Sequence, residues 1–382
     1  MTRISVSEPV LRWALKRSSQ KTGLEQKFPK LQEWISGNSK PTLHQLEALA
    51  KATSTPLGYF FLREPPDEQL SIPHFRTLGD SRPIKSSPDL LETVQSMEGR
   101  QAWMREYLIK QENEQLRFVR SAQLTIEPEQ LANEMRRTLG LSDGWAANHS
   151  SWTEALRQLY NRIEEVGILV AVSGIVGNNT HRKLDPTEFR GFVLVDEYAP
   201  LVFVNGADGK AAQMFTVAHE LAHIWLGSSA AFDLQELGAA DDETEQACNR
   251  VAAEFLVPEN QLREFWPSVR QEPEHFQAIA RHFKVSELVA SRRAMDLDLI
   301  TKKEFLNFYR NYLEKERRSA AKSQEGGDFY ATQNLRIGRR FAEIVICAAR
   351  EGDILYRDAY HLTGLYGRTF ERYAQFLIGR TR

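Results

Sequence analysis

Two histidines one helical turn apart constrain this chain more than any other feature of its sequence. The segment TVAHELAHIWLG, residues 216–227, contains His219 and His223, with Glu220 directly after the first histidine. An α-helix advances about 100° per residue, so both imidazoles lie on one face and can bind one metal ion. Glu220 points about a quarter-turn away, toward a water on such a metal. The residues around the two histidines are apolar, so imidazoles without a partner would be costly to bury here. Gly227 is suited to end the helix.

A third ligand is needed, because a short H-E-x-x-H pattern also occurs by chance. The segment DDETEQACNRVAAEFLVPE, residues 241–259, has the pattern of a second amphipathic helix with an acidic start. Glu245 completes a His₂Glu zinc site with an open position for water. Asn249 lies one turn further on the same face and can hydrogen-bond a ligand imidazole, whereas Glu254 lies about 180° away. The predicted Zn²⁺ ligands are therefore His219, His223 and Glu245.

Charge and cysteine content narrow the class of protein. The net charge is −2, but residues 1–63 carry ten Lys and Arg against four Asp and Glu. Such asymmetry suggests a basic module attached to an acidic body. The only cysteines, Cys248 and Cys347, form no disulfide framework, which fits a reducing compartment. No run reaches the roughly 18 apolar residues of a membrane span, so we expect a cytoplasmic protein with no membrane partner.

Periodicity and turn residues predict an α+β fold that is mainly helical. Three short β-rich segments have the pattern of strands: residues 167–172, 189–196 and 200–206. The second and third are separated by EYA, so we expect them to form a hairpin. Helical patterns occupy most of the remainder, including residues 88–116, 128–140 and 152–165. The expected division is a helical module (1–63), a proline-rich linker with a helix (64–116), a metal-binding domain (117–300), and a helical C-terminal module (301–382) with a flexible loop near 317–328.

The two metal-site segments, HELAHIWLG and EQACNRVAAEFLVP, resemble the metallopeptidases of the ImmA/IrrE family. That family has H-E-x-x-H followed by E-x-x-A-N-x-F-A-x-x-L-L-x-P; here Cys248 and Val251 replace the usual Ala and Phe. The resemblance extends to the large form of the family, in which an Xre-like helix-turn-helix precedes the peptidase and a helical tail follows. It implies a gluzincin-like core and a bacterial protease that cleaves a DNA-binding repressor or an antitoxin.

Peptide hydrolysis by such a site assigns Glu220 as the general base, which takes a proton from water and delivers it to the leaving amine. His181, Tyr198 and His275 are candidates by type for a further donor to the oxyanion, although surface or packing roles are better supported. Either FVLVD or PLVFVN can present a sheet edge to a substrate strand. Asn205 fits a turn at the end of that edge.

The N-terminal module, residues 1–63, resembles an Xre-type helix-turn-helix. The matching positions are Trp34, Gly37, Pro41, Leu46, Leu49 and Ala50, but the usual A-x-x-x-G-V-S before the recognition helix is degraded. Candidate DNA contacts are Lys27, Lys30 and Lys40 for phosphates and Gln32 for a base edge. The alternative is a module that has lost DNA binding and docks a protein. Residues 332–382, with nine Arg against five acids, leave open partner docking, nucleic-acid binding or a solvated basic face.

Two functions are therefore compatible with the sequence. The first is a zinc endopeptidase with a narrow protein substrate, a repressor, an antitoxin or a toxin. The second is a transcriptional regulator or antitoxin-like binding protein that grips DNA or a toxin with little turnover. Glu220 favours the first, because a pure binding protein needs no general base.

Overall fold

The computed structural model describes residues 3–17, 23–68, 70–71, 86–228, 230–232, 243–319 and 329–379. The chain packs into two units, one of residues 1–71 and 81–95 and the other of residues 72–80 and 96–382. The finer four-part division expected from the sequence stays a prediction. Most of the proline-rich linker and residues 320–328 of the expected loop lie outside the described residues.

The first unit contains short helices around a small apolar core. They are α1 (Glu8–Arg17), α2 (Leu24–Lys27), α3 (Leu31–Ile35), α4 (Leu43–Ala52) and the 3₁₀ helix η1 (Leu57–Phe61). A capping box between Thr42 and Gln45 starts α4. Of the positions matched to Xre proteins, Trp34, Leu46 and Leu49 are buried in this core. The candidate DNA contacts Lys27, Lys30, Gln32 and Lys40 are exposed.

A four-stranded sheet organises the second unit. Its strands are β1 (Leu169–Ser173), β2 (Gly191–Leu194), β3 (Leu201–Asn205) and β4 (Ala230–Phe232), in the order β1-β3-β2-β4. β3 runs parallel to β1 and antiparallel to β2, and β2 is antiparallel to β4. The predicted hairpin is therefore present. The expectation that its strands offer a free edge is wrong, because β3 is internal and β4 pairs with β2.

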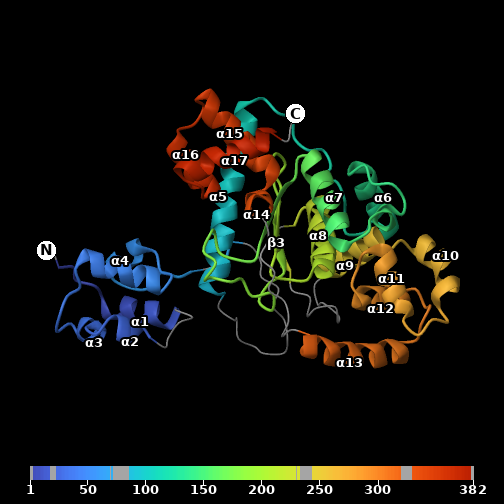
Figure 1. Cartoon of the computed structure of the whole chain (residues 1–382), viewed down its shortest axis with the longest axis horizontal. Helices are drawn as coiled ribbons and strands as arrows, with labels where there is room; N and C mark the ends of the chain where they lie inside the picture. Colours follow the sequence, from blue (N-terminus) through green and yellow to red (C-terminus); the bar gives the residue numbers. More distant parts are fainter. Residues whose placement is uncertain are drawn as a thin grey trace. The chain divides into compact units, whose positions relative to one another are not determined.

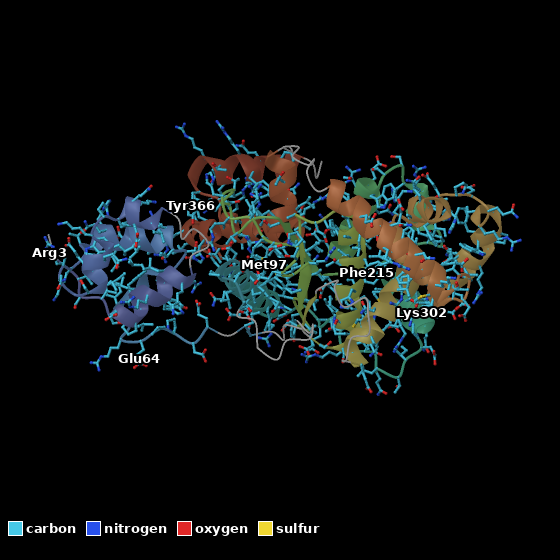
Figure 2. The ribbon with its side chains drawn as sticks, turned by 90° about the horizontal axis from the view of Figure 1, so that it is seen from below. Arg3, Glu64, Met97, Phe215, Lys302 and Tyr366 are labelled. Atoms are coloured by element: carbon cyan, nitrogen blue, oxygen red, sulfur yellow. The ribbon has the colours of Figure 1, made fainter. Side chains whose placement is uncertain are left out.

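Helices cover both faces of this sheet, as its fully buried strands require. On one side, α8 (Lys210–Leu226) packs against β2 and β3 and also contacts α7 (Trp152–Glu165) and α9 (Glu243–Leu256) (Figure 1). On the other side, Gln101 of α5 (Pro88–Lys110) donates hydrogen bonds to the carbonyls of Leu194 and Ala199. Side chains fill the space between these layers, and Met97 and Phe215, both labelled in Figure 2, are buried.

The remaining helices of the second unit surround this centre. They are α6 (Pro128–Thr138), η2 (Trp145–Asn148), α10 (Glu259–Val269), α11 (His275–Phe283), α12 (Glu287–Asp296), α13 (Lys302–Ser319), α14 (Phe329–Ile337), α15 (Arg339–Glu351), α16 (Tyr356–Thr363) and α17 (Gly367–Gly379). α14 packs against β1, and a side chain at Gly338 would come within 2.5 Å of the Val170 carbonyl oxygen. Among the described residues, no helix combines the length and the apolar character needed to cross a membrane.

Candidate metal centre

Helix α8 carries the H-E-x-x-H segment through the interior of the second unit. His219, Glu220 and His223 are each at most 1% exposed, among apolar neighbours on both sides. Gly227 ends the helix in the left-handed region, with φ of 82°, and its N–H donates to the His223 carbonyl. The glycine is suited to this position because it has no Cβ to strain the turn.

Helix α9 packs on α8 and brings Glu245 to both histidines. The Nε2 atom of His219 lies 3.0 Å from one carboxylate oxygen of Glu245, and the Nε2 atom of His223 lies 3.1 Å from the other. The two Nε2 atoms are 3.0 Å apart. In the part of the chain that the structure describes, these three residues form the group of metal-binding side chains.

The opposite ring nitrogen of each histidine is held by a polar side chain. Asn249 Oδ1 lies 3.1 Å from Nδ1 of His219, and Ser228 Oγ lies 2.7 Å from Nδ1 of His223. With hydrogen on Nδ1, each imidazole directs its Nε2 lone pair toward Glu245. The contact of Ser228 with His223 was not predicted from the sequence. The position of Ser228 directly after Gly227 could have indicated it, because the left-handed turn at this glycine folds the chain back over the last turn of the helix.

The residues fit a divalent metal ion. Two imidazole nitrogens and a carboxylate converge in a buried space, where their lone pairs repel one another unless a cation lies between them. This N, N, O donor set is one that zinc takes in proteins. Burial lowers the pKa of His219, which favours the neutral, metal-binding imidazole. Burial alone would raise the pKa of Glu245, but His219 and His223, when they are protonated at Nε2, hold it below its usual value through hydrogen bonds and positive charge.

Glu220 lies beside this cluster without belonging to it. Its side chain is fully buried, and neither of its oxygens has a hydrogen-bond partner among the described residues. Burial raises the pKa of Glu220, and the charge of Glu245 adds to this effect. Gly191 of β2 leaves room for the carboxylate, because a methyl group there would lie 3.3 Å from Glu220 Oε1 and 2.5 Å from Thr216 Cγ2.

Two buried arginines hold the far end of α9. Arg136 donates to the carbonyls of Glu254 and Phe255, at 2.8 and 3.0 Å. Arg293 donates to the carbonyl of Val257 at 3.0 Å and forms an ion pair with the Glu254 side chain. Guanidinium groups at a helix C-terminus satisfy its last carbonyls and favour its negative end. They fix the helix that supplies Glu245.

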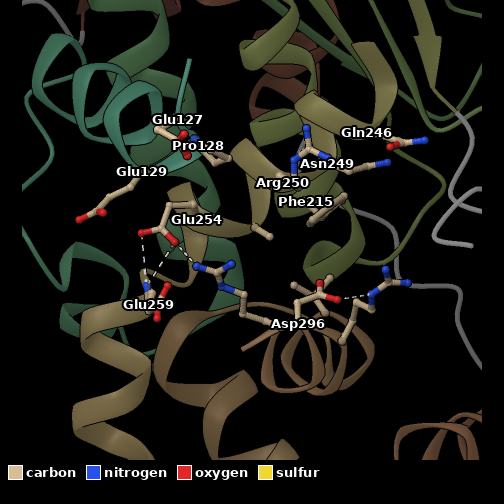
Figure 3. Close-up of a pocket in the computed structure, with 14 residues that line it drawn as sticks. Glu127, Pro128, Glu129, Phe215, Gln246, Asn249, Arg250, Glu254, Glu259 and Asp296 are labelled. Carbon is tan, nitrogen blue, oxygen red and sulfur yellow. Dashed lines mark hydrogen bonds and ion pairs between the residues drawn. The ribbon is translucent and has the colours of Figure 1, made fainter. Parts of the chain in front are cut away.

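A cavity of about 640 Å³ lies beside α9 and is lined mainly by residues of α6, α9 and α12 (Figure 3). Its lining includes Phe215 and Asn249 but not His219, Glu220, His223 or Glu245. Asn249 therefore touches both the cavity and a ligand imidazole. We place the chemistry at the buried donor cluster and not in this cavity, because among the described residues the converging metal-binding atoms belong to that cluster.

The other residues singled out in the sequence have local partners. His275 donates from Nδ1 to the Glu272 carbonyl oxygen at 2.9 Å and packs edge-on against Trp266. His181 is exposed, and Tyr198 is partly exposed in the turn after β2. Asn205 donates to the Phe189 carbonyl and accepts from the Ala207 N–H, which is the expected turn role. These contacts support structural roles.

Residues 163–295 match the model of the IrrE N-terminal-like domain, Peptidase M78. The match supports the ImmA/IrrE family. It indicates a domain of the metallopeptidase type, and we call residues 163–295 the IrrE-like domain below. This domain contains the whole sheet, α8 and α9. Residues 337–376 match a domain of unknown function, DUF8813. A comparison with curated proteins found no match to the chain.

Proposed function

We propose that this protein is a zinc-dependent endopeptidase of the gluzincin type. The observation that carries the proposal is Glu220, a fully buried carboxylate without a hydrogen-bond partner among the described residues, next to the cluster of His219, His223 and Glu245. Burying such a group costs stability. A site that only gripped a partner would gain nothing from that cost, whereas a hydrolase needs a base at this place.

Each residue of the metal centre has a separate role in the proposed peptide hydrolysis. His219, His223 and Glu245 would hold zinc, which when bound acts as a Lewis acid toward the peptide carbonyl and the attacking water. Glu220 takes a proton from that water and delivers it to the leaving amine. Its pKa, raised by burial, suits a group that must hold the proton between the two transfers. Asn249 and Ser228 keep the imidazoles oriented through Nδ1.

The proposed substrate is a DNA-binding repressor, an antitoxin or a toxin, as the ImmA/IrrE resemblance implies. The first unit, residues 1–71 and 81–95, supplies a separate surface for recognising it. We expect a narrow substrate range because a peptidase that cut every accessible chain would harm its own cell, so selectivity needs contacts outside the metal centre. The competing function, a regulator that binds DNA or a toxin with little turnover, predicts that Glu220 is dispensable.

Metal analysis combined with one substitution tests the proposal. We expect about one zinc ion per purified chain, lost in His219→Ala. Glu220→Gln should keep the zinc but lower cleavage of the products of neighbouring genes by about 10²-fold or more, because no base remains. The matched control is Glu243→Gln, the same change at an exposed residue of α9. Equal cleavage by Glu220→Gln and the parent would refute the assigned base.

A further inference from the structure

The end of the second unit contains two helices joined by a short turn. α16 ends at Thr363 and α17 begins at Gly367, so Gly364, Leu365 and Tyr366 form the connection. Gly364 has φ of 67°, and its carbonyl accepts a hydrogen bond from Asn178. A short turn that contains glycine and links two packed helices is a feature of helix-turn-helix motifs, which αα-hairpins share. α15 supplies the third helix that packs against both.

One face of the α16–α17 pair is buried against neighbouring helices of the second unit. Ala359 of α16, Leu365 of the turn and Phe370 and Tyr373 of α17 are each at most 3% exposed. The rings of Tyr360 and Phe370 meet across the two helices, 5.2 Å apart. Tyr373 also donates to Asn334 of α14. The relative position of α16 and α17 is therefore fixed by their own side chains.

The opposite face of α17 is polar and exposed. Its exposed side chains are Arg368, Thr369, Arg372 and Gln375, at intervals of one, three and three residues. This spacing puts them on one side of the helix. Within the described residues, neither arginine forms an ion pair. Arginine and glutamine are the side chains that pair best with guanine and adenine edges.

The surroundings of α17 also suit a phosphate backbone. Tyr356 and Arg357 are exposed at the start of α16, and Tyr366 is 65% exposed in the turn. Hydroxyl and guanidinium groups at such places position a helix-turn-helix on phosphates. Asp358 and Glu371 are the acids of the two helices, and each is only partly exposed. Protein docking is less well supported, because the exposed stripe of α17 lacks a large apolar anchor.

We propose that α17 is a recognition helix that reads the major groove of duplex DNA. An α-helix fits this groove, and the exposed polar stripe supplies donors and acceptors for base edges. DNA binding at this site is independent of any contribution from residues 1–63. It adds a function to residues 337–376 that the peptidase proposal does not require.

Selection from a random duplex library with full-length protein tests this proposal. We expect enrichment of a defined sequence. Arg368→Ala/Arg372→Ala should weaken binding of the enriched duplex about tenfold to a hundredfold, because each good base contact contributes discrimination of that size. Arg350→Ala is the matched control, an exposed arginine on α15, and should bind like the parent. Circular dichroism checks that all variants keep their helices.

Four outcomes would overturn the proposal. The first is no enriched duplex at low salt. The second is binding that the double variant leaves unchanged, which would place the DNA contact outside α17. The third is a preference for single-stranded DNA or RNA over the duplex. The fourth is equal loss of binding in the double variant and in Arg350→Ala, which would indicate only general charge attraction.

Discussion

Glu220 illustrates how a neighbouring backbone can determine the position of a buried carboxylate. The H-E-x-x-H spacing predicts that this side chain lies off the ligand face, and the structure places it against Gly191 of β2. A residue with a Cβ at position 191 would approach both Thr216 and the Phe203 carbonyl too closely. The glycine thus keeps β2 in contact with α8 and leaves the space that Glu220 occupies.

Gly191→Ala should destabilise the protein and impair catalysis together. The new methyl group would lie 2.5 Å from Thr216 Cγ2 and 2.8 Å from the Phe203 carbonyl oxygen, so β2 or α8 must shift. Overpacking of this kind costs about 1–3 kcal/mol. Gly209→Ala is the control, because nothing lies within 4 Å of the added methyl group there. Urea unfolding and cleavage rates of both variants check this, and equal stabilities would contradict it.

The spacing of residues in the sequence was enough to propose the metal-binding side chains, but not the residues that position them. The ligand set His219, His223 and Glu245 was inferred from helix geometry, because the spacing of side chains on a helix is local. Gly191 and Ser228 were not found. Their roles depend on which strand lies against α8 and how the chain turns after Gly227, and neither follows from local periodicity.

Among the elements, helix α9 is held in place by contacts at its C-terminal end as well as by the side chains that face the metal centre. Arg293 is buried, and burial lowers its pKa to about 10, so it remains charged near neutral pH beside Glu254. Removing one member of a buried ion pair leaves the other charge uncompensated. The same helix supplies Glu245, so disorder at its end would loosen the metal centre.

Arg293→Met should therefore lower stability by about 3–5 kcal/mol and weaken zinc retention. Its neighbour offers a close control, because Arg292 pairs with Asp296 on the same helix but both side chains are about a third exposed. Arg292→Met should cost no more than about 0.5 kcal/mol. Unfolding curves and zinc release to a chelator measure the two effects. Similar losses in both variants would show that α9 does not depend on the buried pair.

The elements also show where sequence reasoning stops. α8, α9 and the β2–β3 hairpin were predicted, because each has a local pattern of apolar and turn residues. β4 was missed, since Ala230–Phe232 is too short to show alternation. Its pairing with β2 joins segments far apart in the sequence. The β2–β4 pairing removes the free edge of β2, and the pairing of β1 with β3 removes that of β3, so the edge-strand hypothesis is wrong for both predicted strands.

At the scale of the whole molecule, the C-terminal helices belong to the same unit as the IrrE-like domain. The sequence predicts a helical C-terminal module at residues 301–382 with a loop of linker composition near 317–328, and that finer division stays a prediction. In the structure, α14 packs on β1 and Gly338 lies against the Val170 carbonyl. A polar contact joins the same two parts: Glu164 of α7 accepts a hydrogen bond from the Arg340 N–H in the first turn of α15.

The ionisation of Glu164 should make the stability contributed by this contact depend on pH. Burial raises its pKa to about 7, helped by the charge of Glu343 and opposed by the Arg340 hydrogen bond and by Arg339. An unfolded glutamate has a pKa of about 4.3, so the folded protein holds the extra proton between that value and 7. Stability from this group is therefore largest at low pH and falls as pH rises through about 7.

Glu164→Gln should remove this pH dependence, because the amide oxygen still accepts from Arg340 but carries no charge. A full shift from 4.5 to about 7 corresponds to roughly 3 kcal/mol, and partial solvent exposure reduces this to about 1–2 kcal/mol. The variant should exceed the parent in stability at about pH 8 and match it at about pH 5. Urea unfolding and hydrogen exchange of the α15 amides at both pH values measure this. Glu165→Gln, the same change at the exposed neighbouring residue, should retain the parent's pH dependence. If Glu164→Gln lost stability at both pH values, the carboxylate would be a net stabilising contact, contrary to this account.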